Sequence, residues 1–285
     1  MADKYFVTSL AVWLAATVDA IGGYTGLWTV EGDERPIILG AELLMLLALF
    51  ANSLALKSWV YRNTTSLLYR QVAWLSVGSL LLCIGGDLVN FNLPETYYRH
   101  GSVVKHDYLA DSVWFFAPGY LLLLIASVRV ALANGMSGLP IAGLLSVAGI
   151  IGGVSINAMH LPGTGDYVAA ITGFYGVFIT MVGASGLALV LSFKTARFKP
   201  GVLLVGGGIV LATVADSVIG QFWIYGNGGE GYFPAARYIN WSLYIGSQCL
   251  VIHLARIALW NGPASASAPA PVVAAAPTSR TIPIS

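Results

Sequence analysis

Two aspartates stand inside strongly apolar segments of the chain, and they are the residues best suited to chemistry. Asp87 lies in "LLLCIGGDLVNFNL" (80–93) and Asp216 lies in "GGIVLATVADSVIG" (207–220). A charge at the centre of a membrane costs at least ~2.5–3.5 kcal/mol on insertion scales, so intramembrane carboxylates normally face the interior of a helix bundle. There they mark a binding site or a pathway. We therefore take Asp87 and Asp216 as candidates for a functional site.

Membrane helices are the elements that must position these acids. Hydrophobic residues make up 57% of the 285 residues and charged residues 9%, far below the roughly 25% of soluble domains. Apolar stretches of ~20 residues, enough to cross a hydrocarbon layer of ~30 Å, recur with short polar breaks. The sequence predicts an all-α, polytopic bundle of eight transmembrane helices over residues 6–29, 36–57, 70–93, 109–133, 138–160, 166–193, 199–225 and 235–260.

The bundle is expected to occupy residues 1–260. Residues 261–285 are mostly Ala, Pro and Ser, too poor in large apolar side chains to offset the entropy of ordering them, and we predict a disordered tail. An internal repeat of two parallel four-helix halves, 1–134 and 135–260, is also predicted. Aligning 110–132 with 237–259 pairs Trp114 with Trp241 and Gly119 with Gly246. Similar composition of the two segments remains an alternative explanation of these matches.

The basic residues indicate the orientation of the bundle. All of the 14 Lys and Arg residues except Arg35, Arg99, Lys105 and Arg237 fall on the side of the two termini. The excess of basic residues on the cytoplasmic side of membrane proteins then predicts a multi-pass protein of the cell (inner) membrane with both termini in the cytoplasm. A net charge of +1 offers no argument for a nucleic-acid partner. Nothing in the sequence indicates an oligomeric state.

Several polar residues are expected at the depth of the two aspartates. Counting ~1.5 Å per helical residue places Asp87 and Asp216 at matching heights in the outer half of the membrane. Asp19 and Glu42 reach a similar level, together with Asn90, Asn157, His160, Gln221 and Asn240. A structural pair, hydrogen-bonded to polar groups of other helices, remains an alternative for Asp87 and Asp216, and structure and function are equally open for Asp19 and Glu42.

The histidines do not indicate a metal centre. His100, His106 and His160 have no metal-like spacing with cysteines or carboxylates, so we predict neither a metal nor another cofactor. His253 lies deep in the eighth predicted helix, where we expect a satisfied core histidine. Cys83 and Cys249 also fall inside predicted helices, where a thiol usually behaves as a small hydrophobe.

Three segments resemble one known family. "GSLLLCIGGDLVNF" looks like the Ser-Leu-Leu-Gly-Asp helix of the YhhN-type lysoplasmalogenases, and "GGIVLATVADSVIG" looks like their later Phe-x-x-Ser-Asp helix. "WSLYIGSQCLVIHLA" is similar to the family's Tyr-x-x-x-Gln pattern, which places Tyr244 and Gln248 at the matching positions. The long loop at 94–108 and the start of the helix at 109–133 depart from the family's compact form.

The resemblance implies hydrolysis of the vinyl-ether bond of a lysolipid drawn from the membrane lipids. One of Asp87 and Asp216, kept neutral by burial, would protonate the vinyl carbon. The other, ionised, would stabilise the resulting cation and take a proton from the attacking water. The substrate-binding residues would be Asp19, Glu42, Asn90, Asn157, Tyr244 and Gln248. The reaction requires no metal.

A second resemblance and a second chemistry compete with this interpretation. "GGDLVN" followed by "DSVWFFAPGYLLL" is similar to membrane sensor domains found in front of bacterial diguanylate cyclases, which implies a sensor module without turnover. Acids at one depth in two parallel halves also suit a proton-coupled transporter of small molecules, with its substrate at the interface of the halves. Hydrolase, sensor and transporter all remain open at this point.

Overall fold

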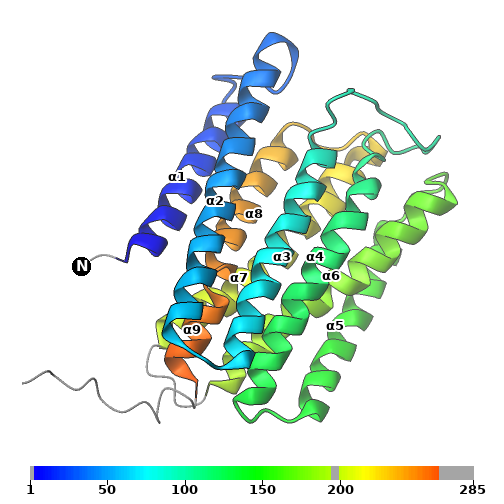
Figure 1. Cartoon of the computed structure of the whole chain (residues 1–285). Coiled ribbons are helices and arrows are strands. Elements are labelled where there is room, and N and C mark those ends of the chain that lie inside the picture. The colour runs from blue at the N-terminus through cyan, green and yellow to red at the C-terminus, as the bar shows by residue number, and fades with distance from the viewer. Residues whose placement is uncertain (1–2, 194–198, 263–285) are drawn as a thin grey trace, which may run out of the picture.

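The computed structural model describes residues 3–193 and 199–262, and within these residues the chain forms helices and no strands. Figure 1 shows the long helices running side by side as one bundle. They are α1 (Lys4–Tyr24), α2 (Arg35–Asn63), α3 (Leu67–Asn90), α4 (Leu109–Ala133), α5 (Gly138–Met159), α6 (Asp166–Ser192), α7 (Lys199–Val218), α8 (Ala235–Val251) and α9 (Leu254–Asn261). The predicted all-α fold class is confirmed.

The long helices have the length and composition of membrane spans. Within the described residues, seven are long and apolar enough to cross a membrane, and α8 with α9 gives an eighth if the bent pair counts as one span. This agrees with the predicted polytopic bundle. The first helix ends at Tyr24 instead of residue 29 because Gly26 adopts a positive φ of 75°, which terminates an α-helix and is easy only for glycine.

Two of the predicted helices are less regular than the sequence suggested. The helix expected over 199–225 is α-helical to Val218 and continues as a π-helix, η2, over Ile219–Ile224. The helix expected over 235–260 breaks between Val251 and Leu254, and α8 and α9 meet at a bend of 40°. Breaks of this kind re-aim the side chains beside them, and π-turns occur frequently at functional sites.

One end of the bundle carries a folded cap, which we define as residues 91–108 and 225–234. It includes the short 3-10 helix η3 (Gly226–Gly229), and a further 3-10 helix, η1 (Gly32–Glu34), precedes α2. The Lys105 amide donates to the Gly229 carbonyl at 2.8 Å, and the Tyr98 hydroxyl donates to Glu230 at 2.6 Å. The cap therefore joins two loops that are far apart in the sequence.

The predicted tail and the predicted repeat are the other two features of the chain's organisation. Apart from Asn261, the last residue of α9, and Gly262, the predicted disordered tail over 261–285 lies outside the described residues. The predicted repeat of 1–134 and 135–260 pairs α3 and α4 with α7 and α8. In Figure 1, α3 and α4 are neighbours within the bundle.

Candidate functional site

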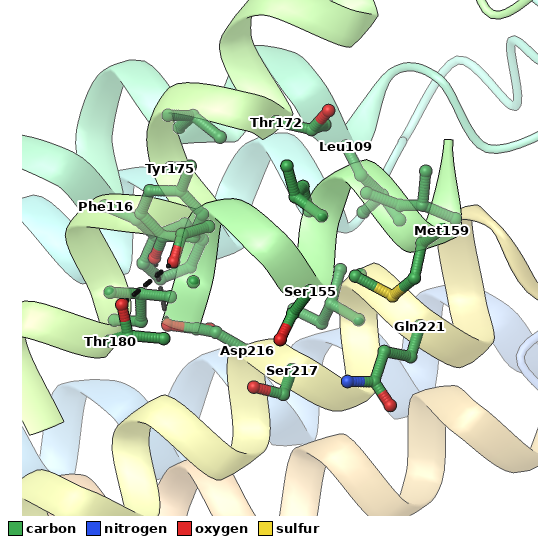
Figure 2. A pocket seen from close by; sticks show the side chains of 18 of the residues that line it. Leu109, Phe116, Ser155, Met159, Thr172, Tyr175, Thr180, Asp216, Ser217 and Gln221 are labelled. Carbon is green, nitrogen blue, oxygen red and sulfur yellow. Dashed lines mark hydrogen bonds between the residues drawn. The ribbon is translucent and has the colours of Figure 1, made fainter. Parts of the chain in front are cut away.

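A cavity of about 110 Å³ lies between α4, α5, α6 and the π-helical end of α7. Since one water molecule occupies ~30 Å³ of liquid, it has room for a few waters or one small polar group with a short apolar segment. Asp216 and Tyr175 line it, and six further polar residues do the same: Ser112, Ser155, Thr172, Thr180, Ser217 and Gln221. Figure 2 shows Asp216, Ser217 and Gln221 following one another along one wall, opposite Ser155 and Met159.

Asp216 is the carboxyl group of this cavity. It lies two residues before the end of α7 and is buried. The Tyr175 hydroxyl, from α6, donates a hydrogen bond of 2.9 Å to its Oδ2. The Tyr120 side chain of α4 also interacts with this carboxyl. Three helices therefore hold one acid at the boundary between an apolar interior and a cavity rich in hydroxyl groups.

Asp87 belongs to the same buried cluster but does not line the cavity. It lies near the end of α3 and accepts a hydrogen bond of 2.7 Å from the Tyr244 hydroxyl of α8. Its charge interacts with that of Asp216. Cys83 and Tyr120 interact electrostatically with both carboxyl groups. The structure brings the two predicted acids together electrostatically, yet only Asp216 faces the empty space.

Asp19 and Glu42 form a separate polar group with an arginine. Arg237 Nη2 lies 2.7 Å from Glu42 Oε2, and both side chains are buried. The Asp19 carboxyl interacts with Glu42 and with the charge of Arg237. These two residues, predicted as substrate ligands, are thus engaged with each other and with Arg237.

The other predicted substrate-binding residues are scattered. Tyr244 is bound to Asp87, whereas Gln248 is buried on α8 away from the cavity. Asn90 lines a void of about 10 Å³ beneath the cap, beside Arg35 and Arg237. Asn157 is exposed on α5 and lies outside the cavity lining. Of the residues predicted to be catalytic or substrate-binding, the structure places only Asp216 in the cavity.

Two residues that bind the buried acids were not predicted from the sequence. Tyr175 lies about a third of the way along the apolar helix α6, and a tyrosine at that depth is a signal of a polar partner. Arg237 was counted only as a basic residue near a helix end. Its place at the start of α8, at the height of buried acids, could have indicated an ion pair, because intramembrane charges normally pair.

No group of three or more His, Cys, Asp or Glu residues that could hold a metal ion occurs among the residues the structure describes. Comparison with known proteins adds no assignment. No protein-family model matches the sequence, and neither the curated proteins nor the solved structures contain a significant match.

Proposed function

We propose that this chain is a membrane hydrolase that cleaves the vinyl-ether bond of a lysoplasmalogen-like lysolipid, with Asp216 acting at the reacting atoms. One observation carries the proposal: a buried carboxyl group, hydrogen-bonded to Tyr175, faces a cavity lined by hydroxyl groups inside an apolar bundle. The resemblance of the α3, α7 and α8 segments to YhhN-type lysoplasmalogenases supports the choice of substrate.

One carboxyl group in the cavity suffices for the reaction. Neutral Asp216 gives its proton to the vinyl carbon remote from the ether oxygen, which leaves an oxocarbenium ion. The Asp216 carboxylate then takes a proton from a water molecule as the water oxygen attacks the cationic carbon. The resulting hemiacetal separates into an aldehyde and an alcohol. One substrate molecule and one water molecule are consumed, and the carboxyl group ends as it began.

Asp87 has a different role in this proposal from the one expected of an equal acid/base partner. Because it does not line the cavity, it acts through its charge, which interacts with that of Asp216 and favours the cationic intermediate. Tyr244 holds its carboxylate in place. Leu109, Ile156 and Met159 line the apolar part of the cavity and would receive the vinyl end of the chain. The rest of the lysolipid would lie among the surrounding membrane lipids.

Aldehyde release from a choline lysoplasmalogen by the full chain in detergent tests the proposal. We expect release by the wild type, loss of it in Asp216→Asn, and a smaller reduction in Asp87→Asn. Asp111→Asn is the matched control, because Asp111 lies in the first turn of α4 and binds Arg99 and Tyr167 outside the cavity. Absence of release by well-folded wild type, or unchanged release by Asp216→Asn, would overturn the assignment.

A ligand-sensing module is the second candidate function. A tyrosine already donates a hydrogen bond to each of the two aspartates, and Asp87 does not line the cavity. Such a module needs a cavity that recognises a ligand but no reacting pair. Titration of the lysolipid into the wild type and into Asp216→Asn separates the two functions. Binding that is lost in the variant, without aldehyde release by the wild type, would identify the sensor.

The distribution of basic residues further supports a location in the cell (inner) membrane, with both termini in the cytoplasm and the cap outside. Reporter fusions test this orientation. A fluorescent protein fused after residue 262 should fold and fluoresce, whereas alkaline phosphatase at the same position should be inactive. Fusions placed after residue 101, in the cap, should give the opposite result. The reverse pattern would invert the topology.

A further inference from the structure

A further polar group, apart from those at Asp216 and at Arg237, lies at the end of the bundle opposite the cap. It consists of Ser9 on α1, Asn52 on α2 and His253 at the break between α8 and α9, and all three residues are buried. Ser9 Oγ lies 3.1 Å from His253 Nε2, and Asn52 Nδ2 lies 3.0 Å from Ser9 Oγ. Two helices and the break between α8 and α9 therefore contribute to one contact between a serine and a histidine.

The donor and the acceptor of each hydrogen bond in this group can be assigned. Asn52 Nδ2 also donates to the Tyr5 carbonyl at 2.9 Å, and because a carbonyl oxygen can only accept, the orientation of the amide is determined. Its second hydrogen is directed to Ser9 Oγ. The Ser9 hydroxyl proton is then available to His253 Nε2. This is the arrangement of a nucleophile and its base.

His253 lies at the break in the last helix pair. It is the N-cap residue of α9, at the 40° bend, and its side chain makes no capping hydrogen bond to that helix. Its ring centroid lies 6.0 Å from that of Phe6 on α1. Phe6 is 41% exposed, so the imidazole has one aromatic neighbour that reaches the surface of the bundle.

Ser9 also lines an apolar cavity of about 220 Å³ between α1, α7 and α8, twice the volume of the cavity at Asp216. Among the described residues that line it, only Ser9, Cys249 and the indole of Trp13 carry a polar side-chain atom, and none is charged. Its other large side chains are Phe6, Leu10, Trp13, Leu204, Leu211 and Leu250. Phe6, Leu10 and Trp13 are also exposed on the outer surface of α1, which faces the lipid in a bundle of this kind.

The depth of Ser9 matches the position of an ester in a membrane lipid. Ser9 stands five residues after Lys4, the first residue of α1, which is about 7 Å along the helix axis. In a bilayer, the ester groups of the lipids lie near the boundary between the head groups and the hydrocarbon. Trp13 lies one turn deeper, and the cavity continues along it toward Gly246 and Leu211. An acyl chain in this cavity would run toward the middle of the membrane with its carbonyl at Ser9.

We propose that Ser9 and His253 form an acyl-transfer site for an acyl-ester lipid, independent of the hydrolase proposed for the Asp216 cavity. Ser9 Oγ attacks the ester carbonyl carbon while its proton moves to His253 Nε2. Once Ser9 Oγ is bonded to the acyl carbon, the Asn52 hydrogen that Ser9 Oγ accepted in the resting site becomes available to the developing oxyanion. The alcohol leaves with the proton from His253, and acyl-Ser9 remains. A water molecule then attacks the acyl carbonyl, gives its proton through His253 to Ser9, and a fatty acid is released.

An alkyl fluorophosphonate, which reacts covalently with activated serines, tests the proposal on the full chain in detergent. Mass spectrometry of the wild type should place the adduct on the peptide that contains Ser9, and Ser9→Ala should abolish labelling. Thr8→Ala is the matched control, because Thr8 is the preceding residue and its hydroxyl is bonded to the Lys4 carbonyl on the exposed side of α1. It should label at the wild-type rate.

His253→Gln separates chemistry from packing. Glutamine keeps a polar group beside Ser9 but cannot take its proton, and a general base contributes about 10²–10⁴-fold. We expect the labelling rate to fall at least ~100-fold with an unchanged melting temperature. A lower melting temperature with an unchanged labelling rate would assign the group to structure alone.

Vesicles of diacyl phosphatidylcholine give a second readout. Fatty acid should be released by the wild type and by Asp216→Asn but not by Ser9→Ala, which makes failure of this site distinguishable from failure of the hydrolase. Wild type without an adduct at Ser9, or labelling that persists in Ser9→Ala, would overturn the proposal.

Discussion

Tyr244 on α8 donates a hydrogen bond of 2.7 Å to Asp87 on α3, across 157 residues of sequence. Tyr175 on α6 makes the corresponding bond of 2.9 Å to Asp216 on α7. Each buried aspartate is therefore held by a phenol from another helix, and the difference between them is that only Asp216 and Tyr175 line the cavity. This difference allows the roles of the two acids to be tested through their partners.

Tyr175→Phe should slow aldehyde release at least ~10-fold, because the Tyr175 hydroxyl stabilises the carboxylate that forms as Asp216 gives up its proton. A hydrogen bond to a charged group contributes about 1.5–3 kcal/mol, and about 1.4 kcal/mol corresponds to a factor of ten. Tyr244→Phe should have the smaller effect on turnover, since its aspartate lies off the cavity. Initial rates at saturating lysolipid, with melting temperatures of both variants, provide the measurement. A larger loss of turnover in Tyr244→Phe would move the reacting carboxyl from Asp216 to Asp87.

Removing one partner of the Arg237–Glu42 pair should be costly. Arg237→Met leaves Glu42 buried without its counter-charge, and breaking a buried ion pair destabilises a protein by about 3–5 kcal/mol. The double variant Glu42→Leu/Arg237→Met should recover much of that loss, because apolar side chains of similar volume can replace a buried pair. Unfolding free energies in mixed detergent micelles measure both effects.

Arg99→Ala is the control for that experiment. Arg99 Nη1 lies 3.2 Å from Asp111 Oδ2, and the Arg99 side chain is 54% exposed. Exposed ion pairs contribute about 0–1 kcal/mol to stability. Its unfolding free energy should stay close to that of the wild type. If the double variant were as unstable as Arg237→Met, the charge of Glu42 would not be the origin of the loss.

The cap should lose stability in acid. His106 is 1% exposed, neither ring nitrogen has a hydrogen-bond partner, and the rings of Tyr97, Tyr108, Trp223 and Phe233 surround it. Burial, helped by the neighbouring Lys105 charge, lowers the pKa of His106 from 6.5 to about 4.

The direction of the pH effect follows from that shift. Above pH 6.5 the imidazole is neutral in the folded and the unfolded cap, so it adds no pH dependence. Between pH 6.5 and 4 only the unfolded cap binds the proton, and stability falls with the pH by about 3 kcal/mol in total. Hydrogen exchange of cap amides measured over this range should show the slope in the wild type and a flatter one in His106→Phe. Equal slopes would assign the pH dependence to other groups.

Most of the fold could be predicted from the sequence because, in lipid, the helix is the structure in which a single segment satisfies its own backbone hydrogen bonds. A segment without water must satisfy its own amides, and an apolar run of the right length therefore forms a helix. The predicted helix over 109–133 coincides with α4. The π-turn at Ile219–Ile224 and the break before Leu254 could not be anticipated, because both depend on how neighbouring helices pack.

The sequence predicts the depth of the site residues in the membrane but not the direction in which their side chains point. Counting residues along a helix gives the height of Asp87 and Asp216, and the structure brings these two acids into one cluster. The rotation of each helix about its axis is set by packing, which the count does not contain. Asn157 therefore points away from the cavity, and Tyr175 points into it. Ser9 and His253 were hidden for a related reason, since 244 residues separate them.

Helices α1 and α2 touch through polar groups at two heights. Ser9 meets Asn52, and Asp19 meets Glu42. On both helices the two positions are ten residues apart, 9 to 19 and 42 to 52, or about 15 Å. Lipid tails are as apolar as leucine, so apolar side chains alone set the register of two membrane helices only weakly. A slip of one residue would break both contacts at once. The two contacts therefore fix the register of the α1–α2 hairpin at two heights, and any sliding of α1 along its axis must carry α2 with it.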